Sequence, residues 1–283
     1  MFFLQVLLNG FSLGVTYGVV ALGLTVIFGV MHILNFTHGA LLMLGGYCIF
    51  YSTVGFLHVP YFAGLVLAFI FPGLFGALYE KLLLRRYRGE ILVCLIITLA
   101  LSKILQGTAQ ATFGLMHKAI PPLFGTTLRL GGLFISSDRL FVVLASLVLL
   151  VGTLMLIDYS KIGTAIRAVS IDNEAALLQG INVGVIYSFG MFMSCGLAGI
   201  AGALMSLTNP IDAYMGEAPL ITCFIVMIIG GLGSIGGTLV AAGVIGILES
   251  FVTSYFGNLV AGIVNFTILI TFLLIRPKGI SGE

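Results

Sequence analysis

The chain has 283 residues, of which 60% are hydrophobic and only 8% are charged. An average soluble domain carries roughly 25% charged residues, so this chain has too few charges to coat a water-soluble particle. Its net charge of +2 is too small to indicate a nucleic-acid partner. The composition therefore excludes a soluble enzyme and a nucleic-acid-binding protein, and it predicts an all-α helical bundle embedded in membrane lipid.

Apolar runs that are long enough to cross a membrane recur along the whole chain. A helix needs about 20 apolar residues to span ~30 Å of hydrocarbon. The runs that meet this length lie at 2–30, 37–57, 61–80, 91–113, 139–157, 185–207, 219–254 and 258–275. We therefore expect a single membrane domain over 1–283 with about eight transmembrane segments. Because the first basic residue is Lys81, we expect the first run to be a membrane segment rather than a cleavable signal peptide.

The basic residues predict an orientation. Lysine and arginine accumulate in cytoplasmic loops, and here they cluster at 81–90, at 158–184 and in the tail after residue 275. We therefore place these stretches, and with them the C-terminus, in the cytoplasm, and we place the 114–138 loop outside. Eight simple crossings cannot satisfy this arrangement, so we expect one segment to be broken or re-entrant.

The run at 219–254 is the expected place of the break. Its length would correspond to a single helix of ~54 Å at 1.5 Å per residue, and five glycines interrupt it between 230 and 237. Glycine lets a chain turn sharply, and irregular backbone at membrane depth needs protein or water to shield it. We therefore expect Gly231, Gly233 and Ser234 to lie beside the translocation path.

Other glycines recur at spacings of three or four residues, at positions 10, 14 and 18 and at positions 196, 199 and 202. Small residues at such spacings let helix backbones approach closely in lipid. We expect these glycines to pack helices within one bundle rather than to form a dimer face.

Polar residues at membrane depth are costly and indicate functional sites. Lys103, Gln106 and Gln110 share one face of the fourth segment. This stripe either lines water, or Lys103 pairs with Glu249, the only acidic residue deep in an apolar segment. We favour the pair between Lys103 and Glu249.

Two further groups of polar residues lie between segments. Asn35 and His38 follow the first segment, where they either line the translocation path and hydrogen-bond the cargo or close a break between helices. Asp212 and Glu217 fall in an outer loop, where we expect solvated side chains rather than a docking site for a partner.

The stretch at 158–184 reads DYSKIGTAIRAVSIDNEAALLQGINVG. Its first half has apolar residues at helical spacing. Asp172 is placed to cap a second short helix, with Glu174 in the first turn, and Gly180 is placed to end it. The pattern predicts a cytoplasmic loop with amphipathic helices, whose apolar side is covered either by a groove on a partner or by lipid headgroups.

The run from Glu174 to Gly180 fits EAA-x-x-x-G, the coupling-loop signature of bacterial ABC importer permeases. The rest of the chain resembles one branch of this class, the LivH-like permeases for branched-chain amino acids. The matching stretches are NGFSLGVTYGVVALGLTVIFGVMHILNFTHG at 9–39, IGTAIRAVSIDNEAALLQGINV at 162–183, GGLGSIGGTLVAAGVIGILES at 230–250 and LLIRPKGISG at 273–282. Together these four ordered motifs cover nearly the whole length of the chain.

The resemblance implies a permease subunit in the bacterial inner (cytoplasmic) membrane. A second, related but non-identical permease would complete the pathway, and two ATPase subunits that bind ATP and Mg would drive it. A substrate-binding protein would deliver the cargo outside. The resemblance also implies that Glu174, Ala175, Ala176 and Gly180 couple the permease to the ATPases.

The implied cargo is an amino acid, above all leucine, isoleucine or valine. Alternatives are import of urea or short amides by the same class of transporter, and an ion-coupled secondary carrier. The sequence contains no GxxxxGK[ST] phosphate loop, and the match of GLGSIG to a dinucleotide fingerprint lacks the soluble strand–helix unit that the fingerprint requires. We therefore expect no catalytic residues, no metal and no cofactor on this chain.

Overall fold

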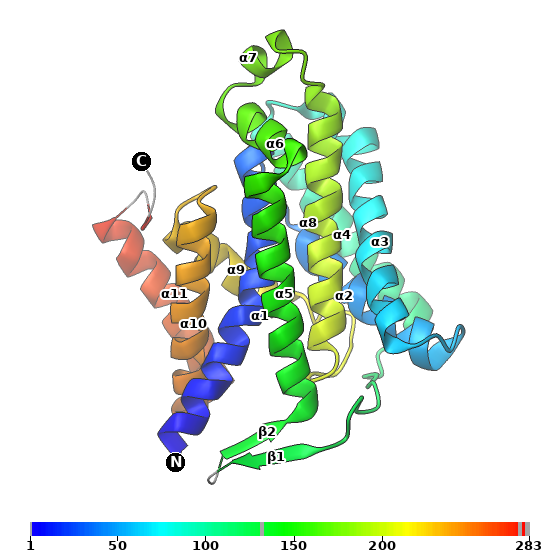
Figure 1. Cartoon of the computed structure of the whole chain (residues 1–283), viewed down its shortest axis with the longest axis vertical. Helices are drawn as coiled ribbons and strands as arrows, with labels where there is room; N and C mark the ends of the chain where they lie inside the picture. Colours follow the sequence, from blue (N-terminus) through cyan, green and yellow to red (C-terminus); the bar gives the residue numbers. More distant parts are fainter. Residues whose placement is uncertain (1, 131–132, 277–278, 281–283) are drawn as a thin grey trace.

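The computed structural model describes residues 2–130, 133–276 and 279–280, and helices make up most of them (Figure 1). In chain order the elements are α1 (Phe2–Met31), α2 (Thr37–Phe50), the π-helical turn η1 (Tyr51–Gly55), α3 (Tyr61–Tyr79), the π-helical turn η2 (Glu80–Leu84), the 3₁₀ turn η3 (Arg85–Tyr87), α4 (Ile91–Phe113), β1 (Thr127–Leu130), β2 (Leu133–Ser136), α5 (Ser137–Tyr159), α6 (Lys161–Ile171), α7 (Asn173–Leu178), α8 (Val183–Met205), α9 (Glu217–Gly230), α10 (Ile235–Phe256) and α11 (Asn258–Ile275). The two strands pair as an antiparallel hairpin.

Within the described ranges, seven helices are long and apolar enough to cross a membrane: α1, α3 with its two following turns, α4, α5, α8, α10 and α11. The predicted bounds 91–113 and 258–275 coincide with α4 and α11. The other two membrane elements, α2 and α9, have only 14 residues each. The prediction of an all-α polytopic bundle is therefore confirmed.

The two ends of the bundle carry different structures (Figure 1). The N-terminus and the β-hairpin lie at one end, which we call the hairpin end; α6 and α7 lie at the other, which we call the α7 end. The 81–90 stretch also lies at the α7 end, because the guanidinium of Arg88 sits 4.3 Å above the ring of Tyr187 in α8. Two of the predicted basic stretches therefore share one end, opposite the 114–138 loop; Lys278 of the tail lies outside the described residues.

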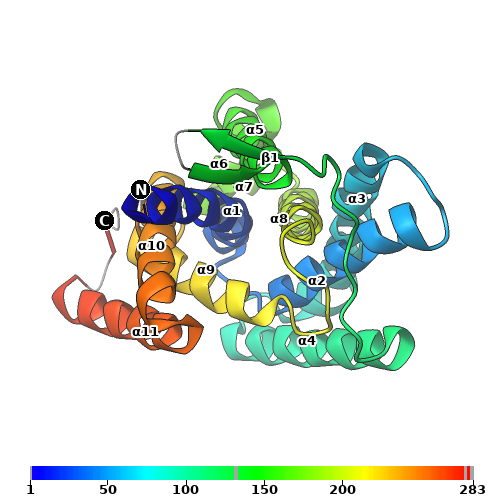
Figure 2. The same ribbon diagram turned by 90° about the horizontal axis from the view of Figure 1, so that it is seen from below.

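Close backbone contacts hold the centre of the bundle, where α1 lies beside α10 and α8 lies beside α2 and α3 (Figure 2). A Cβ atom at Gly14 would lie 2.9 Å from the carbonyl oxygen of Ala242 in α10. In α8, a Cβ at Gly199 would collide with Ala68 of α3, and one at Gly202 with Leu42 of α2. These glycines therefore pack helices of the same chain, as the sequence predicts.

The predicted break in the 219–254 run is present. Helix α9 ends at Gly230 and α10 begins at Ile235, so the chain reverses its direction within four residues. Gly231 and Gly233 adopt φ angles of 104° and 84°, a region that non-glycine residues rarely enter. The break lies at the α7 end, where a Cβ on Gly233 would lie 3.6 Å from Gly29 near the end of α1.

Candidate functional site

Helices α6 and α7 form a platform at the α7 end of the bundle. The Ser160 hydroxyl caps α6 by accepting a hydrogen bond of 2.9 Å from the N–H of Gly163. The Asp172 carboxylate caps α7 by accepting from the N–H groups of Glu174 and Ala175, at 2.9 and 3.0 Å. Gly180 follows with a φ of +81° and ends the turn. The predicted cap at Asp172 and the predicted helix end at Gly180 are therefore confirmed, and the Ser160 cap is an additional finding.

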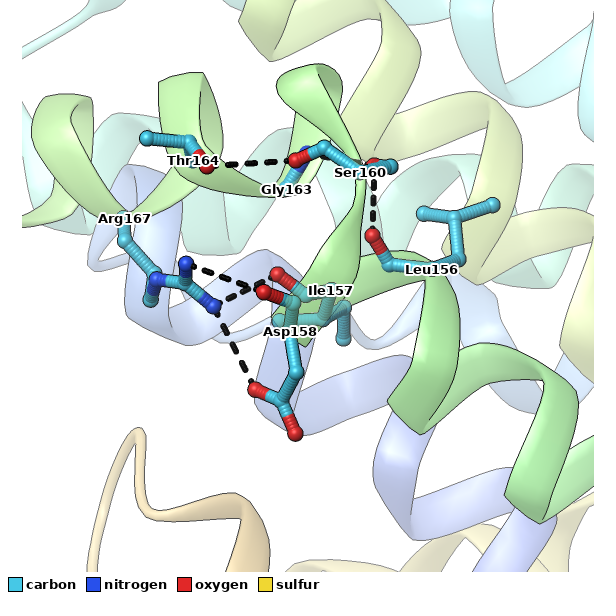
Figure 3. Close-up of polar contacts among 7 residues, drawn as sticks. All are labelled: Leu156, Ile157, Asp158, Ser160, Gly163, Thr164 and Arg167. Atoms are coloured by element: carbon cyan, nitrogen blue, oxygen red, sulfur yellow. Dashed lines mark hydrogen bonds and ion pairs between the residues drawn. The ribbon is translucent and has the colours of Figure 1, made fainter.

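Arg167 ties the platform to the end of α5 (Figure 3). Its guanidinium donates to the carbonyl oxygen of Ile157 at 2.6 Å and to the backbone and carboxylate oxygens of Asp158, both at 3.3 Å. The Ser160 hydroxyl donates to the carbonyl of Leu156 at 2.5 Å. The bonds from Arg167 satisfy carbonyls of Ile157 and Asp158 that the end of a helix leaves unpaired. Together with the Ser160 bond they link α6 to the end of α5.

The apolar sides of both platform helices divide into a buried part and an exposed part. Ile166, Val169 and Ala176 are buried against Val30 at the end of α1 and against the start of α8. The side chains of Ile171 and Leu178 remain 86% and 90% exposed. The platform is thus anchored to the bundle, while a second apolar surface on it has no cover within the described part of this chain.

A second site lies halfway along the membrane helices, where α2 and α9 begin. A Cβ at Gly39 in the first turn of α2 would lie 2.7 Å from the carbonyl oxygen of Gly216, which precedes α9. Phe36 and Phe224 contact each other across this junction, with ring centroids 5.0 Å apart and ring planes tilted by 47°. Helix α4 closes the third side, and a cavity of about 250 Å³ lies between the three helices.

Lys103, Gln106 and Glu217 form a polar network on this cavity. The Lys103 ammonium donates to the Glu217 carboxylate at 2.7 Å and to the Gln106 side-chain oxygen at 3.0 Å. The Gln106 amide donates to the same Glu217 oxygen at 3.1 Å. Lys103 is central in α4, twelve residues after its first residue, so the network lies near mid-depth.

The predicted partner of Lys103 was wrong. Glu249 instead accepts hydrogen bonds from Tyr17 at 2.7 Å and from Asn265 at 2.8 Å, which satisfies this carboxylate between α1, α10 and α11. Glu217 was expected to be solvated in a loop, but it occupies the first turn of α9. The signal for this was present in the sequence, because Glu217 directly precedes an apolar run and acidic residues are enriched in the first turn of a helix.

Asn35 and His38 are buried and bonded to protein groups. Asn35 donates to the Tyr79 hydroxyl at 2.8 Å, and its side-chain oxygen accepts from the N–H of Thr37 at 3.1 Å. The His38 Nε2 atom lies 3.1 Å from the carbonyl oxygen of Val20. Asn35 thus bonds within the break between α1 and α2, and His38 contacts the middle of α1. A role of either residue in the translocation path stays a prediction.

Gly231, Gly233 and Ser234 lie apart from the cavity, in the turn between α9 and α10. The Ser234 hydroxyl accepts from the N–H of Gly237 at 3.3 Å and caps α10. Next to it, the N–H of Ile280 donates to the carbonyl of Ile229 at 2.9 Å. The structure thus gives these three residues a place in the reversal of the chain and does not bring them together with Lys103.

Comparison with known proteins assigns the chain to a family. The model of the family described as "Branched-chain amino acid transport system / permease component" matches residues 6–275. The high-affinity branched-chain amino acid transport system permease protein LivH of Escherichia coli K12 is 29% identical, over 100% of this chain and 96% of that protein. BraD of Pseudomonas aeruginosa is 30% identical, over 99% and 96%, and a probable LivH of Methanocaldococcus jannaschii is 32% identical, over 93% and 87%.

The fold has a counterpart among solved structures. PsaBC from Streptococcus pneumoniae, solved in complex with Fab, superimposes with a TM-score of 0.54 at 16% sequence identity, and the match covers 98% of this chain and 93% of that one. At this identity the likeness concerns the fold alone. The family match over nearly the whole chain is the stronger finding, and it shows that this multi-pass membrane protein belongs to the permease components of branched-chain amino acid transport systems.

Proposed function

We propose that this chain is a permease subunit of a binding-protein-dependent ABC importer of amino acids, above all leucine, isoleucine and valine. One observation carries the ATP-driven part of the proposal: a capped, rigidly anchored platform presents the exposed side chains of Ile171, Leu177 and Leu178 at one end of the bundle. One of two partner ATPase subunits, which bind ATP and Mg, covers this surface. Their closure moves the platform and, through the Arg167 contacts, α5.

The basic stretches 81–90 and 158–184 support a cytoplasmic position for the platform in the inner membrane. With the α7 end inside, the hairpin end faces outward and meets the substrate-binding protein that delivers the cargo. The run Glu174, Ala175, Ala176 and Gly180 then lies on the ATPase side of the membrane, where the coupling-loop signature requires it.

The charges on the mid-depth cavity support the proposal of a second permease subunit. The side chains of Lys103 and Glu217 are 61% and 44% exposed, and charges at mid-depth are too costly to face lipid. The face formed by α2, α4 and α9 therefore borders an aqueous path, and a related, non-identical permease chain closes the path on the other side.

The proposal is tested by the variant Leu178→Asp. This side chain is 90% exposed, so the substitution leaves the bundle intact but places a desolvated charge in the ATPase contact. We expect the ATPases that co-purify with the permease to fall by about tenfold or more, because an unpaired buried charge costs several kcal/mol. The matched control is Met116→Asp, which is 83% exposed beyond α4 at the hairpin end.

Unchanged ATPase recovery and unchanged leucine uptake with Leu178→Asp would contradict the proposed docking surface. Equal losses with Leu178→Asp and Met116→Asp would also contradict it, because the effect would then not depend on the side of the membrane.

A further inference from the structure

We propose that the cavity between α2, α4 and α9 binds the zwitterionic head group of a free amino acid during transport. Lys103 receives the carboxylate of the cargo, and Glu217 receives its ammonium group. The proposal rests on the proposed function, and it adds the residues within the membrane that bind the cargo after the binding protein has released it.

Lys103 and Glu217 retain bonding capacity in the structure. An ammonium group has three N–H donors, and Lys103 uses two of them, for Gln106 and Glu217. Both bonds that Glu217 accepts end on its Oε1 atom, and a carboxylate has a second oxygen with its own lone pairs. A zwitterion therefore adds one bond at each pole without breaking the protein's ion pair.

The charge of the cavity suits a cargo with no net charge. Lys103 and Glu217 are the charged residues among those that line it, and their charges cancel. A cation or an anion would find a partner of opposite charge at only one pole of this neutral pair, and its other contact would be with a like charge. A zwitterion meets both charges at once, so the pair selects against molecules that carry only one of the two groups.

The remaining lining residues fit a branched aliphatic side chain. Phe36 and Phe224 form one apolar wall, and Leu99 and Leu220 contribute from α4 and α9. The volume of about 250 Å³ lies just below the range of roughly 300–1,000 Å³ that is typical of sites for larger ligands. Glu217 also stands in the first turn of α9, where the positive end of the helix stabilises its carboxylate.

The test measures leucine binding to the complete transporter in detergent. The binding protein is left out, so that only binding to the site within the membrane is measured. We expect valine to displace radiolabelled leucine, and we expect 3-methylbutylamine and 4-methylpentanoate, which each lack one charged group, to compete at least tenfold more weakly. We also expect Lys103→Met and Glu217→Gln each to raise the Kd for leucine at least tenfold. Lys161→Met, an exposed cation of α6, is the control and should leave the Kd unchanged.

The double variant K103E/E217K separates recognition from folding. It restores an ion pair but reverses the two poles, so a recognition site loses at least tenfold in affinity while the thermal unfolding midpoint stays near that of the wild type. A Kd for leucine restored to the wild-type value would overturn the proposal and leave the pair a purely structural role. Equal competition by acetamide or urea and by valine would overturn it as well.

Failure of the proposal is distinguishable from failure of the proposed function. If the wild-type chain with its ATPases and binding protein does not take up leucine on addition of ATP, the proposed function is wrong. If uptake occurs and Lys103→Met and Glu217→Gln bind leucine with the wild-type Kd, only the assignment of the cavity is wrong.

Discussion

Glu80 is fully buried near the α7 end, and three elements meet around its carboxylate. It forms an ion pair with Arg88, and the Ser188 hydroxyl of α8 donates to it at 2.5 Å. Arg88 also stacks on Tyr187, whose hydroxyl donates to Asn173 of α7 at 2.9 Å. This chain of contacts joins the end of α3, the start of α8 and the platform.

Removing Arg88 alone should therefore lower the free energy of unfolding more than removing the charges of both Glu80 and Arg88. We expect Arg88→Met to lower the free energy of unfolding by about 3–5 kcal/mol, because it leaves the Glu80 charge buried and unpaired. The double variant E80Q/R88M should recover a large part of that loss. Denaturant titration in detergent measures the two values, and an equal loss in both variants would contradict a charged Glu80 held by Arg88.

Sequence reasoning at the residue scale identified Lys103 as a functional candidate but assigned it the wrong partner. The period of a helix shows which residues share a face, so Lys103 with Gln106 was predictable. Which helix lies opposite that face depends on tertiary packing. By sequence Glu249 was the favoured partner, because it lies in an apolar segment and Glu217 was assigned to an outer loop. The structure decides for Glu217 because α9 begins next to the middle of α4.

At the scale of elements, the short helices α2 and α9 determine the site. Each begins near mid-depth, and together their 14-residue lengths leave room for the cavity at their starts. The apolar pattern predicted where the membrane segments lie, because the position of a segment depends only on how apolar residues are distributed along the chain. It did not predict that the 37–57 run has only a short α-helix followed by a π-helical turn, since that departure comes from how the helices pack.

The reversal between α9 and α10 depends on backbone conformation. Gly233 has a φ of +84°, and a Cβ there would make only an ordinary contact of 3.6 Å with Gly29. The substitution Gly233→Ala is therefore disfavoured by conformation rather than by space, and we expect it to cost about 1–2 kcal/mol of unfolding free energy.

Gly236 is the matched control for Gly233. It lies in the first turn of α10, and a Cβ there would meet no atom within 4 Å. Since alanine has a higher helix propensity than glycine by up to ~1 kcal/mol, Gly236→Ala should be neutral or stabilising. The same destabilisation in both variants, measured by denaturant titration, would contradict a specific conformational role for Gly233.

At the scale of the whole molecule, the structure presents two different helix surfaces at mid-depth. The surface of α4 and α9 carries the ion pair and the cavity, whereas the outer surface of α5 is apolar, with Val148 exposed. A lone chain exposes both surfaces. Only the apolar one suits lipid, which supports the proposal that the other borders an aqueous path shared with a second permease.

Thiol accessibility distinguishes a surface that borders water from one that faces lipid. The background is a variant that lacks the four native cysteines, Cys48, Cys94, Cys195 and Cys223. A single cysteine is then placed either at Ile221 on the cavity or at Val148 on α5. Both positions are near mid-depth, and these residues are 43% and 70% exposed, respectively. In the complete transporter in membranes, we expect a charged, water-soluble thiol reagent to modify Ile221→Cys at least tenfold faster than Val148→Cys. We expect leucine, added with its binding protein and ATP, to change the rate of modification of Ile221→Cys only. Equal rates at the two positions, or faster reaction at Val148→Cys, would contradict the account.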